Sequence, residues 1–189
     1  MKPGKNVLTL KIYRWSTGSY LECQDFWRIS GIERDVFLYS QPKAALKDFR
    51  VTSTLDDTYK DGIFKLGVDL RNNGSTAGNM TLVYELLDAN GKVVATGEKA
   101  TNVAAGETRT VSFDQTLPDV KTWTSEAPNL YKLVMTVKEN GKVNEIIPFN
   151  VGFRRIEIKP TEQLARNGKP YICLFINGPV SYTHLTLPT

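Results

Sequence analysis

The sequence has little of what metal or thiol chemistry needs. Its 189 residues include a single histidine, His184, and two cysteines, Cys23 and Cys173, which lie far apart along the chain. Structural and catalytic zinc sites take three or four His, Cys or carboxylate ligands, so a His/Cys zinc site is excluded. The two thiols are interpreted as buried free cysteines, with a disulfide between them as the alternative.

Long apolar runs and concentrated charge are also missing. No stretch approaches the roughly 18 consecutive apolar residues of a membrane-spanning helix, and residues 1–15 lack the apolar core of a signal peptide. The net charge of +4 comes from scattered Lys and Arg residues, without the basic cluster and interleaved rings of a nucleic-acid groove. Neither a membrane nor a nucleic acid is therefore an expected partner.

Helical periodicity is scarce, and alternation with a period of two takes its place. In residues 62–74, the side chains of Phe64, Leu66, Val68 and Leu70 fall on one face and charged side chains on the other. This pattern is typical of a strand that buries one face. Similar patterns predict strands in residues 6–13, 36–40, 44–55, 79–99, 108–117 and 130–153.

Two Asn-Gly pairs interrupt the alternating segments, at Asn90-Gly91 and at Asn140-Gly141. Asn-Gly favours the type I′ turn of a two-residue hairpin, because both central residues of that turn need a positive φ. The sequence therefore predicts two tight hairpins.

About seven strands over residues 42–155 predict an immunoglobulin-like β-sandwich, since strands with one apolar face bury it by stacking two sheets. The Cys…Trp…Cys signature of antibody domains is absent, so the prediction concerns the architecture alone. The fold class is all-β. One helical turn at most is expected, in residues 160–170.

A dense run of rings and charges precedes the sandwich. From Arg14 to Val36 it reads RWSTGSYLECQDFWRISGIERDV. This closely resembles the pattern R-W-S-D-G-S-Y-L-E-x-Q-D-x-W-R-x-S-G-I-x-R-D-V at the end of the N-terminal jelly-roll domain of glycoside hydrolase family 2 β-galactosidases. Residues 121–137, with KTWTSEAPNLY, and residues 151–159, with VGFRRIEIK, resemble later segments of the same family in the same order.

The resemblance implies a domain organisation. Residues 1–41 are expected to be the C-terminal remnant of the jelly-roll sugar-binding domain, and residues 42–155 the sandwich. Residues 156–178, which contain the family-like NGKP, are expected to be a linker and the first strand of a truncated (β/α)8 barrel. Residues 179–189 fit neither domain, and their back-translation resembles a sequencing adapter, so they are interpreted as an artefact. The chain is thus expected to be a fragment.

The resemblance also implies the chemistry of the full-length parent, the hydrolysis of terminal β-D-galactosides with retention. Such enzymes use two carboxylates about 5–5.5 Å apart as nucleophile and acid/base. In this family both are glutamates of the barrel, and no glutamate of this sequence matches either position. No catalytic residue is therefore assigned, the chain is expected to be inactive alone, and the sandwich is expected to act as an interdomain spacer.

One substrate contact is implied within the chain. The family's motif has an aspartate that binds a sugar hydroxyl and in some members a sodium ion, and Thr17 stands at that position. A threonine offers a hydroxyl but no charge. Thr17 is assigned as a substrate-binding candidate in the full-length protein and as a turn residue before Gly18 in this chain. Sodium and magnesium ions are implied as cofactors of the parent family, and no metal or cofactor is expected in this segment.

Other expectations concern partners and alternatives. The resemblance implies a homo-oligomeric parent, with ion pairs of Arg28, Glu33, Arg34 and Asp35 where its domains meet. A stand-alone β-sandwich module that binds carbohydrate or protein is the alternative from another class. β-Glucuronidases and β-mannosidases share the architecture, so the sugar stays open, as does the choice between bacterial cytoplasm and periplasm.

Overall fold

The computed structural model describes residues 3–21, 31–164 and 169–177. These residues fall into two units, Met1–Ser40 and Gln41–Thr189, which are treated separately. Cys23, Arg28 and the suspected artefact at the end of the chain lie outside the described residues, so the predictions about them stay untested.

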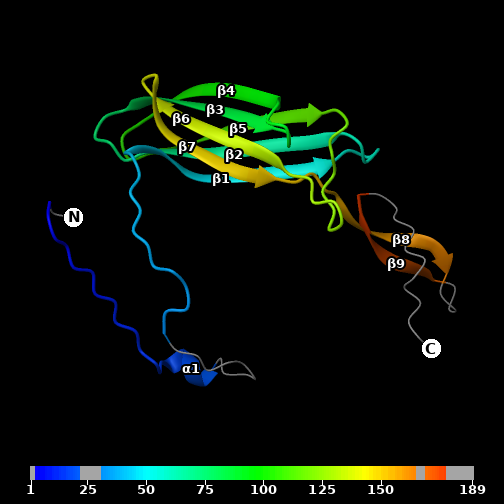
Figure 1. Cartoon of the computed structure of the whole chain (residues 1–189), viewed down its shortest axis with the longest axis horizontal. Helices are drawn as coiled ribbons and strands as arrows, with labels where there is room; N and C mark the ends of the chain where they lie inside the picture. Colours follow the sequence, from blue (N-terminus) through cyan, green and yellow to red (C-terminus); the bar gives the residue numbers. More distant parts are fainter. Residues whose placement is uncertain (1–2, 22–30, 165–168, 178–189) are drawn as a thin grey trace. The chain divides into compact units, whose positions relative to one another are not determined.

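Seven strands of the second unit form a β-sandwich (Figure 1). One sheet has the order β1-β2-β5 and the other the order β4-β3-β6-β7, with every neighbouring pair antiparallel. The strands are β1 (Ala44–Leu55), β2 (Gly62–Asn72), β3 (Gly78–Leu87), β4 (Val93–Val103), β5 (Thr108–Leu117), β6 (Tyr131–Glu139) and β7 (Lys142–Val151). This confirms the predicted all-β, immunoglobulin-like architecture.

The sandwich core is built by the alternation that the sequence shows. All four apolar side chains of the pattern in β2 are buried, and the intervening Lys65 is exposed. From the other sheet, β3 contributes Leu82 and Tyr84, and β6 contributes Leu133 and Met135, all fully buried. Apolar burial of this kind supplies roughly 25 cal/mol per Å² and drives the two sheets together.

The two Asn-Gly turns differ. At the β6–β7 turn both Asn140 and Gly141 have positive φ, of 49° and 82°, as a type I′ turn requires. At the β3–β4 turn only Gly91 has positive φ, so the predicted type I′ turn is wrong there. The reason is Asp88, whose Oδ1 accepts hydrogen bonds from the backbone N–H groups of Asn90 (2.8 Å) and Lys92 (3.0 Å) and thereby stabilises a longer loop.

Strands β1 and β7 run side by side in the same direction, one from each sheet. Near their starts, the Glu145 carboxylate accepts a hydrogen bond from the Leu46 N–H at 2.8 Å. Near their ends, the Ser53 hydroxyl donates to the Gly152 carbonyl at 2.8 Å. The chain therefore enters the sandwich at one end and leaves it at the other (Figure 1).

After the sandwich the chain forms a two-stranded antiparallel hairpin from β8 (Ile156–Leu164) and β9 (Pro170–Ile176). Residues 160–164, where at most one helical turn is expected from the sequence, belong to β8, which pairs with β9 at Pro160 and Leu164. The start of a barrel in this segment stays a prediction.

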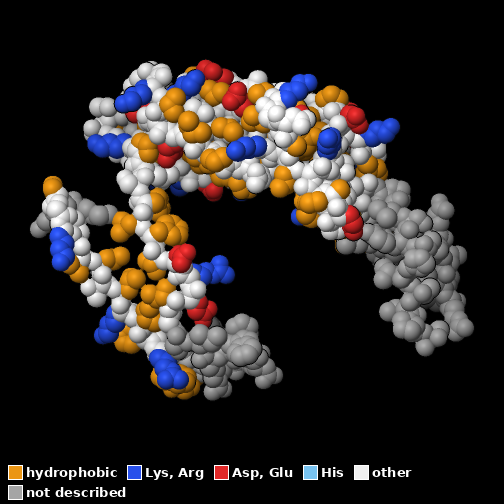
Figure 2. Space-filling model, in the orientation of Figure 1, with side chains coloured by type: hydrophobic (Ala, Val, Ile, Leu, Met, Phe, Trp, Pro, Cys, Tyr) orange, Lys and Arg blue, Asp and Glu red, His pale blue; other side chains and the backbone are white. Residues whose placement is uncertain are grey.

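The first unit contains one short helix, α1 (Thr17–Leu21), and no strand among its described residues. The predicted strands at 6–13 and 36–40 are therefore wrong for this structure. A strand needs a neighbour to complete its hydrogen bonds, and no second strand pairs with either segment in the described part of this unit. Their apolar side chains are exposed, Val7 at 83% and Phe37 at 79%, and orange side chains follow this part of the chain in Figure 2.

Candidate functional site

Thr17 is the first residue of α1 and is exposed. The turn predicted at this position is replaced by a single helical turn, which begins at Ser16. The backbone N–H of Ser19 donates to the Ser16 carbonyl, and the Ser16 N–H donates to the Ser19 hydroxyl, both at 3.1 Å. Nothing in the structure tests whether Thr17 binds a sugar.

Residues 31–40 are exposed along their whole length. Within the described part of the chain, Glu33, Arg34 and Asp35 form no ion pair with one another or with other residues. The ion pairs expected of them where domains of the full-length protein meet stay a prediction.

The densest arrangement of charges in the described residues is a group that we call the polar clamp: Asp57, Tyr59, Arg155, Glu157 and Lys159. Asp57 and Tyr59 lie in the β1–β2 loop, and the other three lie at the start of the hairpin, about 100 positions later. The Tyr59 hydroxyl donates to Glu157 Oε2 at 2.6 Å, and Lys159 Nζ contacts the same oxygen at 2.9 Å. Arg155 donates to Glu157 Oε1 at 2.9 Å and to Asp57 at 2.7 Å.

The charges of Glu157, Lys159 and Arg155 are stabilised by their neighbours in the polar clamp. The hydrogen bond from Tyr59, followed by those from Lys159 and Arg155, lowers the pKa of Glu157 from 4.5 to about 2. The same contacts raise the pKa of Lys159 through Glu157 and that of Arg155 through Asp57. A carboxylate with such a low pKa stays ionised near neutral pH and is a poor general acid there. The clamp is therefore suited to holding segments of the chain together and not to proton transfer.

A second anchor joins the hairpin to the sandwich through Asn177, directly after β9. Its backbone N–H donates to the Arg155 carbonyl at 2.8 Å, and its side-chain Oδ1 accepts from the Arg155 N–H at 2.9 Å. Its Nδ2 donates to the carbonyl of Trp123, in the β5–β6 loop, at 2.9 Å. Asn177 has a φ of +56°, a left-handed conformation that asparagine tolerates better than most residues.

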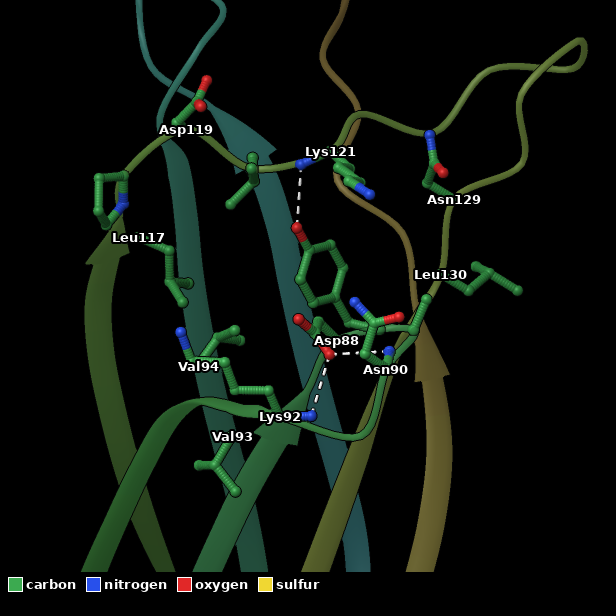
Figure 3. Close-up of a pocket in the computed structure, with 14 residues that line it drawn as sticks. Asp88, Asn90, Lys92, Val93, Val94, Leu117, Asp119, Lys121, Asn129 and Leu130 are labelled. Atoms are coloured by element: carbon green, nitrogen blue, oxygen red, sulfur yellow. Dashed lines mark hydrogen bonds between the residues drawn. The ribbon is translucent and has the colours of Figure 1, made fainter.

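A cavity of about 400 Å³ opens at one end of the sandwich, between the β3–β4 loop and the segment from Leu117 to Tyr131 (Figure 3). Several of its polar groups already form hydrogen bonds within the surrounding loops. Asp88 closes the β3–β4 loop, the Tyr131 hydroxyl accepts the Lys121 N–H at 2.9 Å, and Asn129 donates to a neighbouring carbonyl at 2.9 Å. The cavity has the size of a small-ligand site but no free converging set of polar atoms.

A shallower hollow of about 590 Å³ lies beside β1 and the exit of β7. It contains Trp123 and Arg154, whose guanidinium lies 5.1 Å from the centre of the Trp123 ring. Gly152 passes directly behind that ring, and a Cβ there would lie 3.0 Å from Trp123 Cβ. Trp123 is thus a packing residue between the loop and the exit strand.

No metal centre is built by the described residues, in which no three His, Cys, Asp or Glu side chains gather. Thr17 supplies a neutral oxygen where the related pattern has a carboxylate, so the residues around it do not fit a sodium site on their own. The described part of the chain also contains no helix with the length and apolar character needed to cross a bilayer.

The sequence motifs did not reveal the polar clamp. Tyr59 and Glu157 are 98 positions apart, and neither belongs to a recognisable pattern. The one available signal is in β8, where Glu157 and Lys159 alternate with Ile156 and Ile158 and so share one face.

Comparison with known protein families supports the family that the sequence motif and the fold indicate. The family described as "Glycosyl hydrolases family 2" matches residues 44–154, and its "sugar binding domain" matches residues 1–42. The chain therefore belongs to glycosyl hydrolase family 2.

The curated relatives that are similar to this chain include β-galactosidases. A β-galactosidase of Priestia megaterium is 38% identical over 94% of this chain, and one of Halalkalibacterium halodurans is 39% identical over 92%. The chain spans only 17% and 16% of these two relatives. It is thus similar to about one sixth of a β-galactosidase.

Solved structures support the fold alone, because their sequence identities are low. A β-glucuronidase of Bacteroides uniformis superposes on 82% of this chain with a TM-score of 0.70 and 19% identity, and the chain covers 18% of it. An exo-chitosanase of Amycolatopsis orientalis superposes on 79% with a TM-score of 0.63 and 21% identity, and the chain covers 17% of it.

Proposed function

We propose that this chain is the non-catalytic region of a β-galactosidase and that its sandwich is a spacer between the domains on either side. The full-length protein then hydrolyses terminal β-D-galactosides by the retaining mechanism, on carboxylates that this chain does not contain. Sodium and magnesium ions as cofactors, and assembly into a homo-oligomer, belong to the same proposal for the full-length protein.

The passage of the chain through the sandwich is the observation that carries the spacer role. Since β1 and β7 run in the same direction, entry and exit lie at opposite ends. The eleven steps between the twelve residues of β1, at about 3.3 Å each, separate these ends by roughly 36 Å. A domain connected in this way sets the distance between the domains before and after it. A domain with adjacent termini would not separate them.

A chimeric enzyme tests the proposal. Residues 44–154 replace the matching region of the Priestia megaterium β-galactosidase, and hydrolysis of a chromogenic β-galactoside is measured. The chimera is expected to be active, and a version with a flexible Gly/Ser linker in place of the sandwich is expected to lose most of its activity. A folded but inactive chimera would contradict the family role, and an active linker version would contradict the spacer role.

The chain alone should show no turnover of the same substrate above the blank. Hydrolysis that persists through purification would overturn its assignment as non-catalytic.

The alternative, a stand-alone β-sandwich module that binds carbohydrate or protein, would use the cavity in Figure 3, which has the size of a small-ligand site. Titration of the chain with galactose and with lactose, monitored by NMR of the Asn90 and Lys121 amides, distinguishes the binding module from the spacer. Saturable shifts would favour the binding module, and unchanged spectra to high concentration would favour the spacer.

A further inference from the structure

We propose that the polar clamp and Asn177 make the β8–β9 hairpin a rigid continuation of the sandwich, so that the sandwich sets the direction of the outgoing chain as well as its distance. This inference rests on the proposed spacer function and deepens it. Tyr59, Glu157 and Asn177 are then positioning residues, which act on the segment that follows and contact no substrate.

The two anchors lie at the base of the hairpin, one on each strand, where Ile156 of β8 pairs with Ile176 of β9. The clamp ties the start of β8 to the β1–β2 loop through Glu157, which accepts from Tyr59, Arg155 and Lys159. Asn177 ties the end of β9 to the β5–β6 loop through Trp123. A single anchor would leave the hairpin free to pivot, whereas contacts from both strands to two different loops restrain its direction.

The clamp is partly shielded from water. The side chains of Glu157 and Arg155 are 17% and 23% exposed, and Arg155 also donates to the Leu55 carbonyl at 3.3 Å. Surface ion pairs contribute little because solvent screens them and both side chains stay mobile. A network in which one carboxylate receives three donors is more rigid than an isolated pair.

The clamp also decides which face of β8 points outward. Successive side chains of a strand point to opposite faces, so Glu157 and Lys159 facing Tyr59 leave Ile156 and Ile158 on the other side. These two isoleucines are 50% and 72% exposed. Without the clamp, burial of this apolar face against the sandwich would favour a different direction of the hairpin.

Residual dipolar couplings of the weakly aligned chain test this inference. In the wild type, the N–H couplings of residues 156–159 are expected to fit the alignment tensor determined from β1–β7. In the double variant Tyr59→Phe/Glu157→Gln, they are expected to shrink by about twofold or more as the hairpin moves independently. Wild-type couplings that need a separate, smaller tensor would overturn the proposal, as would couplings that the double variant leaves unchanged.

Three controls separate a loosened hairpin from a damaged fold. Asp114→Asn removes the exposed ion pair with Lys65 on β2 and should leave the hairpin couplings unchanged. Asn177→Gly keeps the left-handed backbone but removes the amide, and should loosen the hairpin as the double variant does. Unaltered couplings within β1–β7 in every variant would show that the sandwich itself is intact.

Limited trypsin digestion gives a second measurement. Cleavage after Arg155 should accelerate about tenfold in Tyr59→Phe/Glu157→Gln and stay at the wild-type rate in Asp114→Asn. Equal rates in both variants would contradict the clamp. Neither measurement uses β-galactosidase activity, so the two proposals can fail separately. A mobile hairpin together with an active chimera would contradict this inference alone. A rigid hairpin together with an inactive chimera would contradict the proposed function alone.

Discussion

Gly97 of β4 lies directly against the ring of Tyr84 in β3, and a Cβ added to Gly97 would lie 2.7 Å from Tyr84 Cε1. The same Cβ would lie 2.9 Å from Phe113, whose ring meets that of Tyr84 edge-on at a centroid distance of 4.8 Å. Two rings of the core therefore occupy the space above this glycine. The close approach explains why a glycine stands in the middle of a strand, where it is otherwise unfavourable.

Replacing Gly97 with Ala is expected to lower the free energy of unfolding by about 1–3 kcal/mol, because the methyl group overpacks the buried ring of Tyr84 and the half-buried ring of Phe113. Urea unfolding followed by fluorescence measures the change. Gly67→Ala in β2 is the matched control, since its Cβ would meet only the Ser112 hydroxyl at 3.9 Å. The control should be neutral or slightly stabilising, and an equal loss in both variants would contradict the packing explanation.

The Tyr84 hydroxyl is buried and has no hydrogen-bond partner among the described residues, and its burial raises the pKa of the phenol. Tyr84→Phe is therefore expected to leave the free energy of unfolding unchanged or to increase it, because an unsatisfied polar group is removed. Tyr131→Phe, by contrast, removes the acceptor of the Lys121 N–H and should cost about 0.5–1.5 kcal/mol. A clear loss of stability in Tyr84→Phe would show that its hydroxyl has a partner.

The contribution of Glu157 to stability should depend on pH. Its pKa falls from 4.5 to about 2 on folding, so its stabilisation is complete above about pH 4.5 and is lost as the pH falls toward 2. The difference in urea midpoint between the wild type and Glu157→Gln is expected to be constant from pH 7 to 5 and to shrink below that. A difference that persists at pH 2 would contradict the ionised clamp.

The chain is expected to aggregate more readily than a shortened chain of residues 42–155. Large apolar side chains of residues 3–21 and 31–40 are exposed, among them Val7, Tyr20 and Phe37, and exposed apolar segments tend to associate between molecules. Light scattering of both chains at equal concentration and temperature measures this. Equal scattering would count against the expectation.

Sequence reasoning predicted the sandwich well because its signal is local. Phe64 to Leu70 alternate strictly, and two stacked sheets are the structure that buries such strands on one face. The same rule failed for Leu8 to Ile12, which also alternate, because a strand needs a neighbour and the pattern does not say whether one exists.

Contacts made by individual polar side chains could not be predicted in the same way. The β3–β4 turn was decided by the Asp88 side chain and not by the Asn-Gly pair alone. The contact between Tyr59 and Glu157 exists only because the β1–β2 loop and the exit of β7 meet at one end of the sandwich. The family resemblance places Thr17 at a sugar-binding position, and this role stays a prediction.

The parallel course of β1 and β7 has a consequence for how such a domain can be lost or replaced. An inserted domain whose termini lie together can be cut out and the ends rejoined with little disturbance. Here an excision would leave a gap of roughly 36 Å, which at least about ten fully extended residues would have to bridge. A gene that lost the sequence of this sandwich would therefore have to gain a segment that spans a comparable distance in the same step.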